Sequence, residues 1–196
     1  MLYSNLPSFS GCERLPGIEK VLCLSDLHTD DSRNMDWLRE QSAATLEESD
    51  LVVVAGDISH KLSTFAESLR ILRRYAQVFF VPGNHEAWLS PRDDKITSSL
   101  EKLDRIYKLC RDYGVYVDPV YIEYKKKNHL WILPLESWYD GSLTFNERLC
   151  EGFEHWPWVD FARCKWPFPI GDTQSRNPRI PIGLVEYFLK RNEAEI

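Results

Sequence analysis

The sequence predicts a single α/β domain, residues 1–196, built on a mostly parallel sheet, and three observations support this prediction. The chain has 196 residues, which suits one domain and is long enough to bury a hydrophobic core. Apolar runs alternate with amphipathic segments over residues 18–113, a pattern typical of strands and crossover helices in a parallel sheet. Hydrophobic residues make up 43% and charged residues 28% of the chain, which is the profile of a soluble globular domain.

The first half of the chain alternates expected strands with expected helices. The strands are apolar runs over residues 18–24, 51–55 and 78–81. The helices carry apolar residues at helical spacing over residues 31–48, 63–75 and 95–113. We expect Asp31 or Ser32 to cap the first of them. The apolar positions expected to face the core from this first helix are Met35, Leu38, Ala43 (or Ala44) and Leu46.

The pattern changes after Gly114. Short strands are expected over 115–117, 120–124 and 130–133, with the last two forming an antiparallel hairpin that continues the sheet. Residues 137–172 are rich in Trp, Phe and Pro without clear periodicity. This Trp-rich segment is an insertion packed against the sheet or a cap over a pocket; packing is favoured, and one segment can do both. A loop over 173–181 and a last helix over 182–192 are expected to follow.

The net charge and the cysteine content indicate which partners and which cellular compartment to expect. The formal net charge of −6 makes a nucleic-acid partner an unfavoured interpretation, because such surfaces are usually basic. The five cysteines form no close pair, which argues against a disulfide framework or a zinc knuckle. No apolar run approaches the roughly 20 residues of a membrane span. We expect a cytoplasmic protein without membrane association; an organellar transit peptide and the oligomeric state are left open.

Polar side chains follow each of the three parallel strands at its carboxyl end. Asp26 and His28 follow the first strand, Asp57 follows the second, and Asn84 and His85 follow the third. Because the carboxyl ends of parallel strands meet at one edge of a sheet, we expect these side chains to lie close together. Carboxylate, imidazole and amide oxygen suit Mn, Fe, Zn or Mg. The sequence therefore predicts a site for two divalent metal ions, which together can hold a phosphoryl group and activate a water molecule.

Position along the chain favours particular roles for two of these residues. Asp57 lies in the middle of the ligand order and is the natural candidate for a carboxylate that bridges two metal ions. His85 follows a ligand and is placed to protonate a leaving oxygen as a general acid. Gly56 and Gly83 directly precede ligands, where glycine permits tight strand exits and close approach of the backbone to metal or phosphate.

Three segments, SDLHTD, VVVAGDISH and VFFVPGNHEAW, resemble the first three signature blocks of the calcineurin-like metallophosphoesterase superfamily, over residues 18 to 90. The resemblance implies that Asp26 and His28 bind the first metal, that Asp57 bridges, that Asn84 binds the second metal, and that His85 acts on the leaving group. It also implies a calcineurin-like α/β sandwich. The implied activity is metal-dependent hydrolysis of a phosphate monoester or diester on a small molecule or a phosphoprotein.

Two neighbouring residues have roles that the sequence leaves open. His60 lies where many relatives have an acidic residue or a histidine. It positions His85, contacts phosphate, or is an ordinary surface or supporting histidine. Glu86 is expected to orient the loop that carries Asn84 and His85.

The later histidine blocks of the superfamily are not found in this chain. They comprise a His at the end of a later strand and a Gly-His-x-His pair, whereas the remaining histidines, His129 and His155, fit neither block and are interpreted as structural or surface residues. We therefore expect a fold incomplete at its C-terminus, weak occupancy by the second metal and doubtful turnover by the 196-residue form. The alternative function is that of a catalytically inactive, truncated isoform that binds metal or a regulatory partner.

Overall fold

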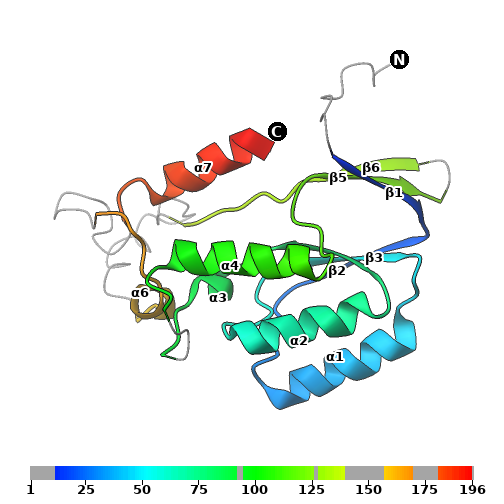
Figure 1. The fold of residues 1–196 in the computed structure, drawn as a ribbon, viewed down its shortest axis with the longest axis horizontal. Coiled ribbons are helices and arrows are strands. Elements are labelled where there is room, and N and C mark those ends of the chain that lie inside the picture. Colours follow the sequence, from blue (N-terminus) through cyan, green and yellow to red (C-terminus); the bar gives the residue numbers. More distant parts are fainter. Residues whose placement is uncertain (1–11, 92–94, 126–127, 140–156, 170–180, 196) are drawn as a thin grey trace, which may run out of the picture.

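The fold is seen in a computed structural model that describes residues 12–91, 95–125, 128–139, 157–169 and 181–195 (Figure 1). Its strands form two three-stranded sheets. The first contains β2 (Lys20–Leu24), β3 (Asp50–Ala55) and β4 (Gln77–Val81), all parallel and adjacent in that order. The second contains β1 (Glu13–Ile18), β5 (Val120–Tyr124) and β6 (Asn128–Ile132), in which β1 is parallel and β6 antiparallel to β5.

Helices cover one face of the parallel sheet. Helix α1 (Ser32–Thr45) connects β2 to β3, α2 (Leu62–Arg73) connects β3 to β4, and α4 (Ser99–Asp112) follows β4. Short helices α3 (Asn84–Ala87) and α6 (Val159–Arg163) and the longer α7 (Leu184–Glu195) complete the described elements. Among the described residues, no helix is long and apolar enough to cross a bilayer. The strand residues that share a core with α1, α2 and α4 are Val52, Val54, Val78 and Phe80.

The second sheet covers the opposite face. Because side chains alternate along a strand, Leu51 and Phe79 point away from the helices. They pack against Leu15, Val120 and Ile122 of the second sheet. The layers are therefore helices, parallel sheet and second sheet, which confirms the predicted α/β class.

The antiparallel hairpin of β5 and β6 is confirmed, but the prediction that it continues the parallel sheet is wrong. The hairpin pairs instead with β1, a strand that the sequence analysis missed. The sequence of β1, ERLPGI, contains proline and glycine and buries only Leu15 and Ile18, so it lacks the apolar alternation of a strand. The expected strand over 115–117 is reduced to a single bridge between Phe79 and Tyr116.

The apolar face of α1 differs in part from its prediction. Met35 and Leu38 are buried as expected, but Ser42 faces the core, whereas Ala43 and Ala44 are exposed. The helical spacing explains this, since positions three and seven residues beyond Met35 lie on its face. The next alanines have already turned toward solvent.

Capping residues decide where the helices begin. Asp31 is the N-cap of α1 and accepts a hydrogen bond from the Arg33 N–H at 2.9 Å, as one of the two expected caps. Helix α4 begins at Ser99 rather than at 95, because the Ser98 hydroxyl accepts a hydrogen bond from the Glu101 N–H at 3.2 Å. The last helix covers 184–195 rather than 182–192. The expected loop over 173–181 and much of the Trp-rich segment lie outside the described residues.

Candidate metal centre

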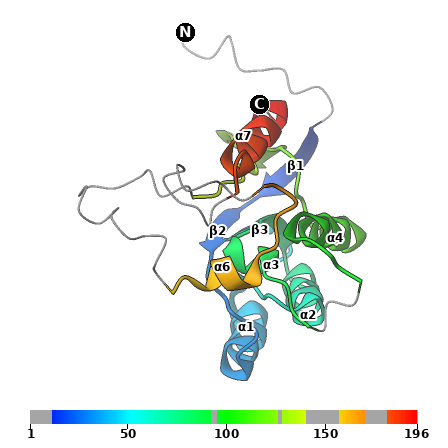
Figure 2. The ribbon, with the colours of Figure 1, turned by 90° about the vertical axis from the view of Figure 1, so that its left-hand side faces the viewer.

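The loops after β2, β3 and β4 bring three of the predicted site residues together. One potential ligand atom each from His28, Asp57 and His85 lie within 4.8 Å of one another. The two imidazole rings have centroids 4.5 Å apart. Helices α3 and α6 lie at this end of the sheet (Figure 2). Two imidazole nitrogens and a carboxylate oxygen at this separation are a donor set that fits a divalent transition-metal ion.

The backbone at these residues is left-handed, a conformation that non-glycine residues rarely adopt. The φ angle is 55° at Asp26, 42° at His28 and 57° at Asp57. Neighbouring loops hold this geometry. The Asp26 N–H donates to the Gly56 carbonyl at 3.3 Å, and the His28 N–H donates to the Asp57 carbonyl at 2.9 Å. Strained backbone at functional sites persists where the surroundings fix it, and here it coincides with the predicted ligands.

Asp26 lies beside the cluster rather than in it. Its Oδ1 is 3.7 Å from His28 Nε2, and its side chain is 69% exposed. The Ser25 hydroxyl donates to the other carboxylate oxygen at 2.6 Å. The carboxylate is thus free enough to turn toward an ion next to His28.

Two glycines allow the loops after β3 and β4 to approach closely. A Cβ atom at Gly83 would lie 2.2 Å from Asp57 Oδ1, and a Cβ at Gly56 would lie 2.3 Å from the Gly83 nitrogen. Both distances are far below van der Waals contact. The close approach is therefore one between the two site loops themselves. The predicted approach of the backbone to metal or phosphate stays a prediction.

Glu86 fixes both of these loops through buried hydrogen bonds. Its Oε2 accepts from the N–H groups of Asp57 at 2.8 Å and Gly83 at 2.9 Å. Its Oε1 accepts from those of Ile58 at 2.8 Å and Ser59 at 3.2 Å. Burial raises the pKa of Glu86, and these N–H groups oppose that rise. The carboxylate orients the loops as the sequence predicts.

His85 is held in place by two contacts. Its backbone N–H donates to Asp57 Oδ1 at 3.1 Å, and its ring stacks on Trp88 with centroids 3.7 Å apart. Burial lowers the pKa of His85, the Asp57 carboxylate opposes this, and His28 reinforces it. These contacts hold the imidazole beside Asp57 and Trp88, and its neutral form is the one that could bind metal.

His60 has a fixed partner that the sequence did not reveal. Its Nδ1 lies 2.9 Å from Asp30 Oδ2, which also accepts the His60 N–H at 3.1 Å. Its ring centroid is 6.0 Å from that of Trp88. Burial lowers the pKa of His60, against the opposing effect of Asp30. His60 is thus a partly buried histidine that contacts the residue stacked on His85.

Comparison with known proteins identifies the family of this chain. The family model described as calcineurin-like phosphoesterase matches residues 19–182. This chain belongs to the calcineurin-like phosphoesterase family. The match includes every predicted site residue.

The chain is similar to PptH of Mycobacterium tuberculosis both in sequence and in structure. The chain is 31% identical over 138 residues to a curated [acyl-carrier-protein] phosphodiesterase, PptH, of Mycobacterium tuberculosis, covering 68% of this chain and 41% of the relative. It is also similar to the crystal structure of phosphopantetheinyl hydrolase (PptH) from M. tuberculosis, with a TM-score of 0.61, 22% identity, and coverage of 91% of this chain and 63% of that one. The chain spans less than two thirds of the length of either. The structural match confirms the calcineurin-like fold.

Of the two remaining histidines, the one that lies among the described residues is not part of the cluster. His129 lies on β6, is exposed, and stacks on Tyr121 with ring centroids 5.3 Å apart, in agreement with a structural or surface role. His155 lies outside the described residues.

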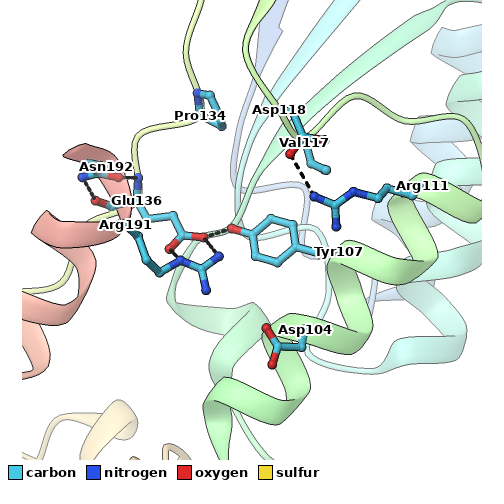
Figure 3. Close-up of a pocket in the computed structure, with 9 residues that line it drawn as sticks. All are labelled: Asp104, Tyr107, Arg111, Val117, Asp118, Pro134, Glu136, Arg191 and Asn192. Carbon is cyan, nitrogen blue, oxygen red and sulfur yellow. Dashed lines mark hydrogen bonds and ion pairs between the residues drawn. The ribbon is translucent and has the colours of Figure 1, made fainter. Parts of the chain in front are cut away.

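The family site is also distinct from a cavity of about 250 Å³ between α4 and α7 (Figure 3). There the buried Glu136 accepts hydrogen bonds from the Tyr107 hydroxyl and, at 3.1 Å, from Arg191. Arg111 pairs with Asp118 at 2.9 Å. The pair formed by Glu136 and Arg191 attaches α7 to the domain.

Asn84 and Asp160 complete the surroundings of the centre. Asn84 begins α3, and its Nδ2 donates to Asp160 Oδ1 at 2.8 Å. Asp160 lies in the Trp-rich segment and was not predicted, because that segment has no periodicity or motif to single it out. Its place at the site is recognised from its contact with Asn84 in the folded structure.

Proposed function

We propose that this protein hydrolyses a phosphate ester with two divalent metal ions held at the carboxyl ends of β2, β3 and β4. The observation that carries the proposal is the convergence of His28, Asp57 and His85 within 4.8 Å, in a chain of the calcineurin-like phosphoesterase family. A metal-ligating set placed on three successive loops of a rigid sheet has the preorganisation that such chemistry needs.

The proposed ligands follow the predicted assignment. Asp26 and His28 hold the first metal ion, Asp57 bridges, and Asn84 holds the second. Bound Mn, Fe, Zn or Mg ions would neutralise charge on the phosphoryl group and lower the pKa of a water molecule. The chain's own contribution is to fix these side chains, through Glu86 and the two loop glycines.

His85 is proposed to hold the proton that goes to the leaving oxygen. Its backbone is fixed by the bond to Asp57 and its ring by Trp88, so the imidazole keeps one orientation. A lowered pKa makes the protonated imidazole a stronger acid. His85 also lies within the ligand cluster, and a His85→Ala variant separates the two roles: loss of turnover with retained metal affinity supports the acid role, and loss of both supports a ligand role.

The substrate class is proposed to be a phosphodiester. The curated relative is named as a phosphodiesterase that acts on acyl-carrier protein, so a carrier protein with a phosphopantetheine arm is the first natural substrate to test. A phosphorylated small molecule and a phosphoprotein are the other candidates.

The test is Mn²⁺ binding by calorimetry together with hydrolysis of bis(p-nitrophenyl) phosphate and p-nitrophenyl phosphate. Asp57→Asn removes the proposed bridging carboxylate and is expected to abolish turnover and to weaken Mn²⁺ binding at least tenfold. Asp36→Asn is the matched control, because Asp36 is an exposed carboxylate on α1. Equal activity and equal affinity in Asp57→Asn and the parent would refute the proposal. Mn²⁺ binding without turnover would support the second candidate, a metal-binding or regulatory protein.

A further inference from the structure

We propose that Asp160 is a positioning residue that sets the orientation of the Asn84 amide and thereby attaches helix α6 to the metal centre. The inference rests on the proposed function, since Asn84 is there a metal ligand. It extends that function to a residue 76 positions away in the sequence.

Asp160 is a buried carboxylate, 2% exposed, in the first turn of α6. A buried carboxylate is strongly destabilising unless donors surround it. Four neutral donors do so here: Asn84 Nδ2 at 2.8 Å and Trp88 Nε1 at 2.5 Å on Oδ1, with Tyr139 OH at 2.9 Å and Trp158 Nε1 at 3.0 Å on Oδ2.

This donor set decides which end of the Asn84 amide faces Asp160. An ionised carboxylate only accepts hydrogen bonds, so the amide atom opposite Asp160 must be the NH₂ nitrogen. The amide oxygen is then turned to the other side of the group, where it is the atom offered to a cation. Without Asp160 the amide could rotate by half a turn and present its NH₂ group, which repels a cation.

Asp160 is held independently of Asn84. The Leu89 N–H donates to the Arg163 carbonyl at 2.8 Å, and the Ser99 N–H donates to the Lys165 carbonyl at 2.7 Å. These bonds fix the C-terminal end of α6 and the residues after it against the segment that joins α3 to α4. Helices α6 and α3 lie together at the same end of the sheet (Figure 2). The carboxylate is therefore a reference point to which the amide is aligned.

The same carboxylate also reaches His85, through Trp88. The Trp88 indole N–H donates to Asp160 Oδ1, and its ring stacks on His85. On the other oxygen, burial and the Asp160 charge raise the pKa of Tyr139, which keeps that hydroxyl protonated as a donor. The Asp160 carboxylate thus holds Asn84 directly and holds Trp88, the residue that stacks on His85.

The test is a double-mutant cycle read by Mn²⁺ affinity of the full chain, with no substrate present. Supporting contacts behind a metal ligand usually change affinity 10–100-fold, so Asp160→Ala is expected to weaken Mn²⁺ binding by at least about tenfold. Asn84→Ala is expected to weaken it as much. The free-energy loss of the double variant should be clearly smaller than the sum of the two single losses, because Asp160 acts in large part through Asn84. Asp160→Asn keeps one carbonyl oxygen for Asn84 and should restore part of the affinity.

Tyr139→Phe is the matched control, since it removes a donor from Oδ2, the oxygen that does not contact Asn84. Its Mn²⁺ affinity should stay within twofold of the parent, even though its thermal midpoint falls. Mn²⁺ affinity within twofold of the parent in Asp160→Ala, or additive losses in the double variant, would overturn the inference while leaving the proposed function intact. If Asp57→Asn and Asn84→Ala also bind Mn²⁺ normally, the metal centre itself is wrong.

A measurement on the parent protein covers the case in which Asp160→Ala does not fold. In a nitrogen-15 correlation spectrum, the Asn84 side-chain NH₂ should show one downfield-shifted proton that is protected from solvent exchange. Asn84→Ala identifies the signal by its loss. Rapid exchange and an ordinary shift for this NH₂ group would contradict the hydrogen bond to Asp160.

Discussion

Gly83→Ala tests whether the contact between the two site loops controls metal binding. Gly83 has φ −98°, a conformation open to any residue, so alanine introduces no backbone strain there. The new Cβ would lie 2.2 Å from Asp57 Oδ1 and 2.9 Å from the Asp57 nitrogen. The effect of this variant therefore arises from the steric clash alone.

The size of the effect follows from that clash. An ordinary contact needs 3.4 Å or more, so the Asp57 carboxylate or the Gly83 loop must move by about 1 Å. Such a movement also breaks the 3.1 Å bond from the His85 N–H to Asp57 Oδ1. Overpacking of this kind costs about 1–3 kcal/mol of stability, and a misplacement of about 1 Å lowers turnover about 100-fold.

The assay combines urea unfolding with Mn²⁺ titration and bis(p-nitrophenyl) phosphate hydrolysis. Gly17→Ala is the matched control, because Gly17 has φ 73° and open space around its Cβ position. It should lose about 1 kcal/mol of stability from backbone strain while keeping its Mn²⁺ affinity. Gly56→Ala combines strain and clash and should show both losses. Unchanged Mn²⁺ affinity in Gly83→Ala would refute the reasoning.

Three further predictions concern the surroundings of the site. Glu86→Gln places an NH₂ group against two backbone N–H donors, and leaving both unsatisfied should cost about 2–6 kcal/mol in urea unfolding; a loss below about 0.5 kcal/mol would show that the loops do not depend on the carboxylate. Burial raises the pKa values of the Cys110 and Cys164 thiols, so native protein at pH 8 should be alkylated by iodoacetamide at the exposed Cys23 and spared at these two, as read by peptide mass spectrometry. The hydrogen bond from Arg33 lowers the pKa of Asp31 from 3.8 to about 2. The contribution of the ionised Asp31 to stability is therefore fully present above pH 3.8 and is lost as the pH falls through about 2. Asp31→Ala should lower the thermal midpoint at pH 7 and lower it by less at pH 2.

The parallel half of the fold could be predicted because its strands are apolar on both faces. The runs at Leu51–Ala55 and Val78–Val81 are covered by helices on one side and by a second sheet on the other. Strands buried on both faces consist almost entirely of apolar residues, and this composition can be recognised in the sequence. Strand β1 could not be predicted in the same way. It lies at a sheet edge, buries only Leu15 and Ile18, and forms through pairing with β5, more than a hundred residues later in the chain.

Some residues of the site could likewise be predicted from the sequence, and others are recognised only by their contacts in the folded chain. His28, Asp57 and His85 each lie in the loop that follows a parallel strand. The topology of the sheet alone therefore predicts that their side chains lie close together. Asp30 and Asp160 could not be predicted, because their importance comes from the partner each one contacts. A buried aspartate surrounded by indole, phenol and amide donors has no local sequence pattern. Only the folded chain brings the donors together.

The left-handed backbone at Asp26, His28 and Asp57 has a consequence for engineering. Each such turn opposes folding by about 1 kcal/mol relative to glycine, and the surrounding core must outweigh it. A library selected for heat resistance without an activity screen should therefore enrich glycine or asparagine at these three positions and remove the proposed ligands. Stabilised variants meant to retain a metal centre should keep all three positions fixed and draw their gains from the helical layer.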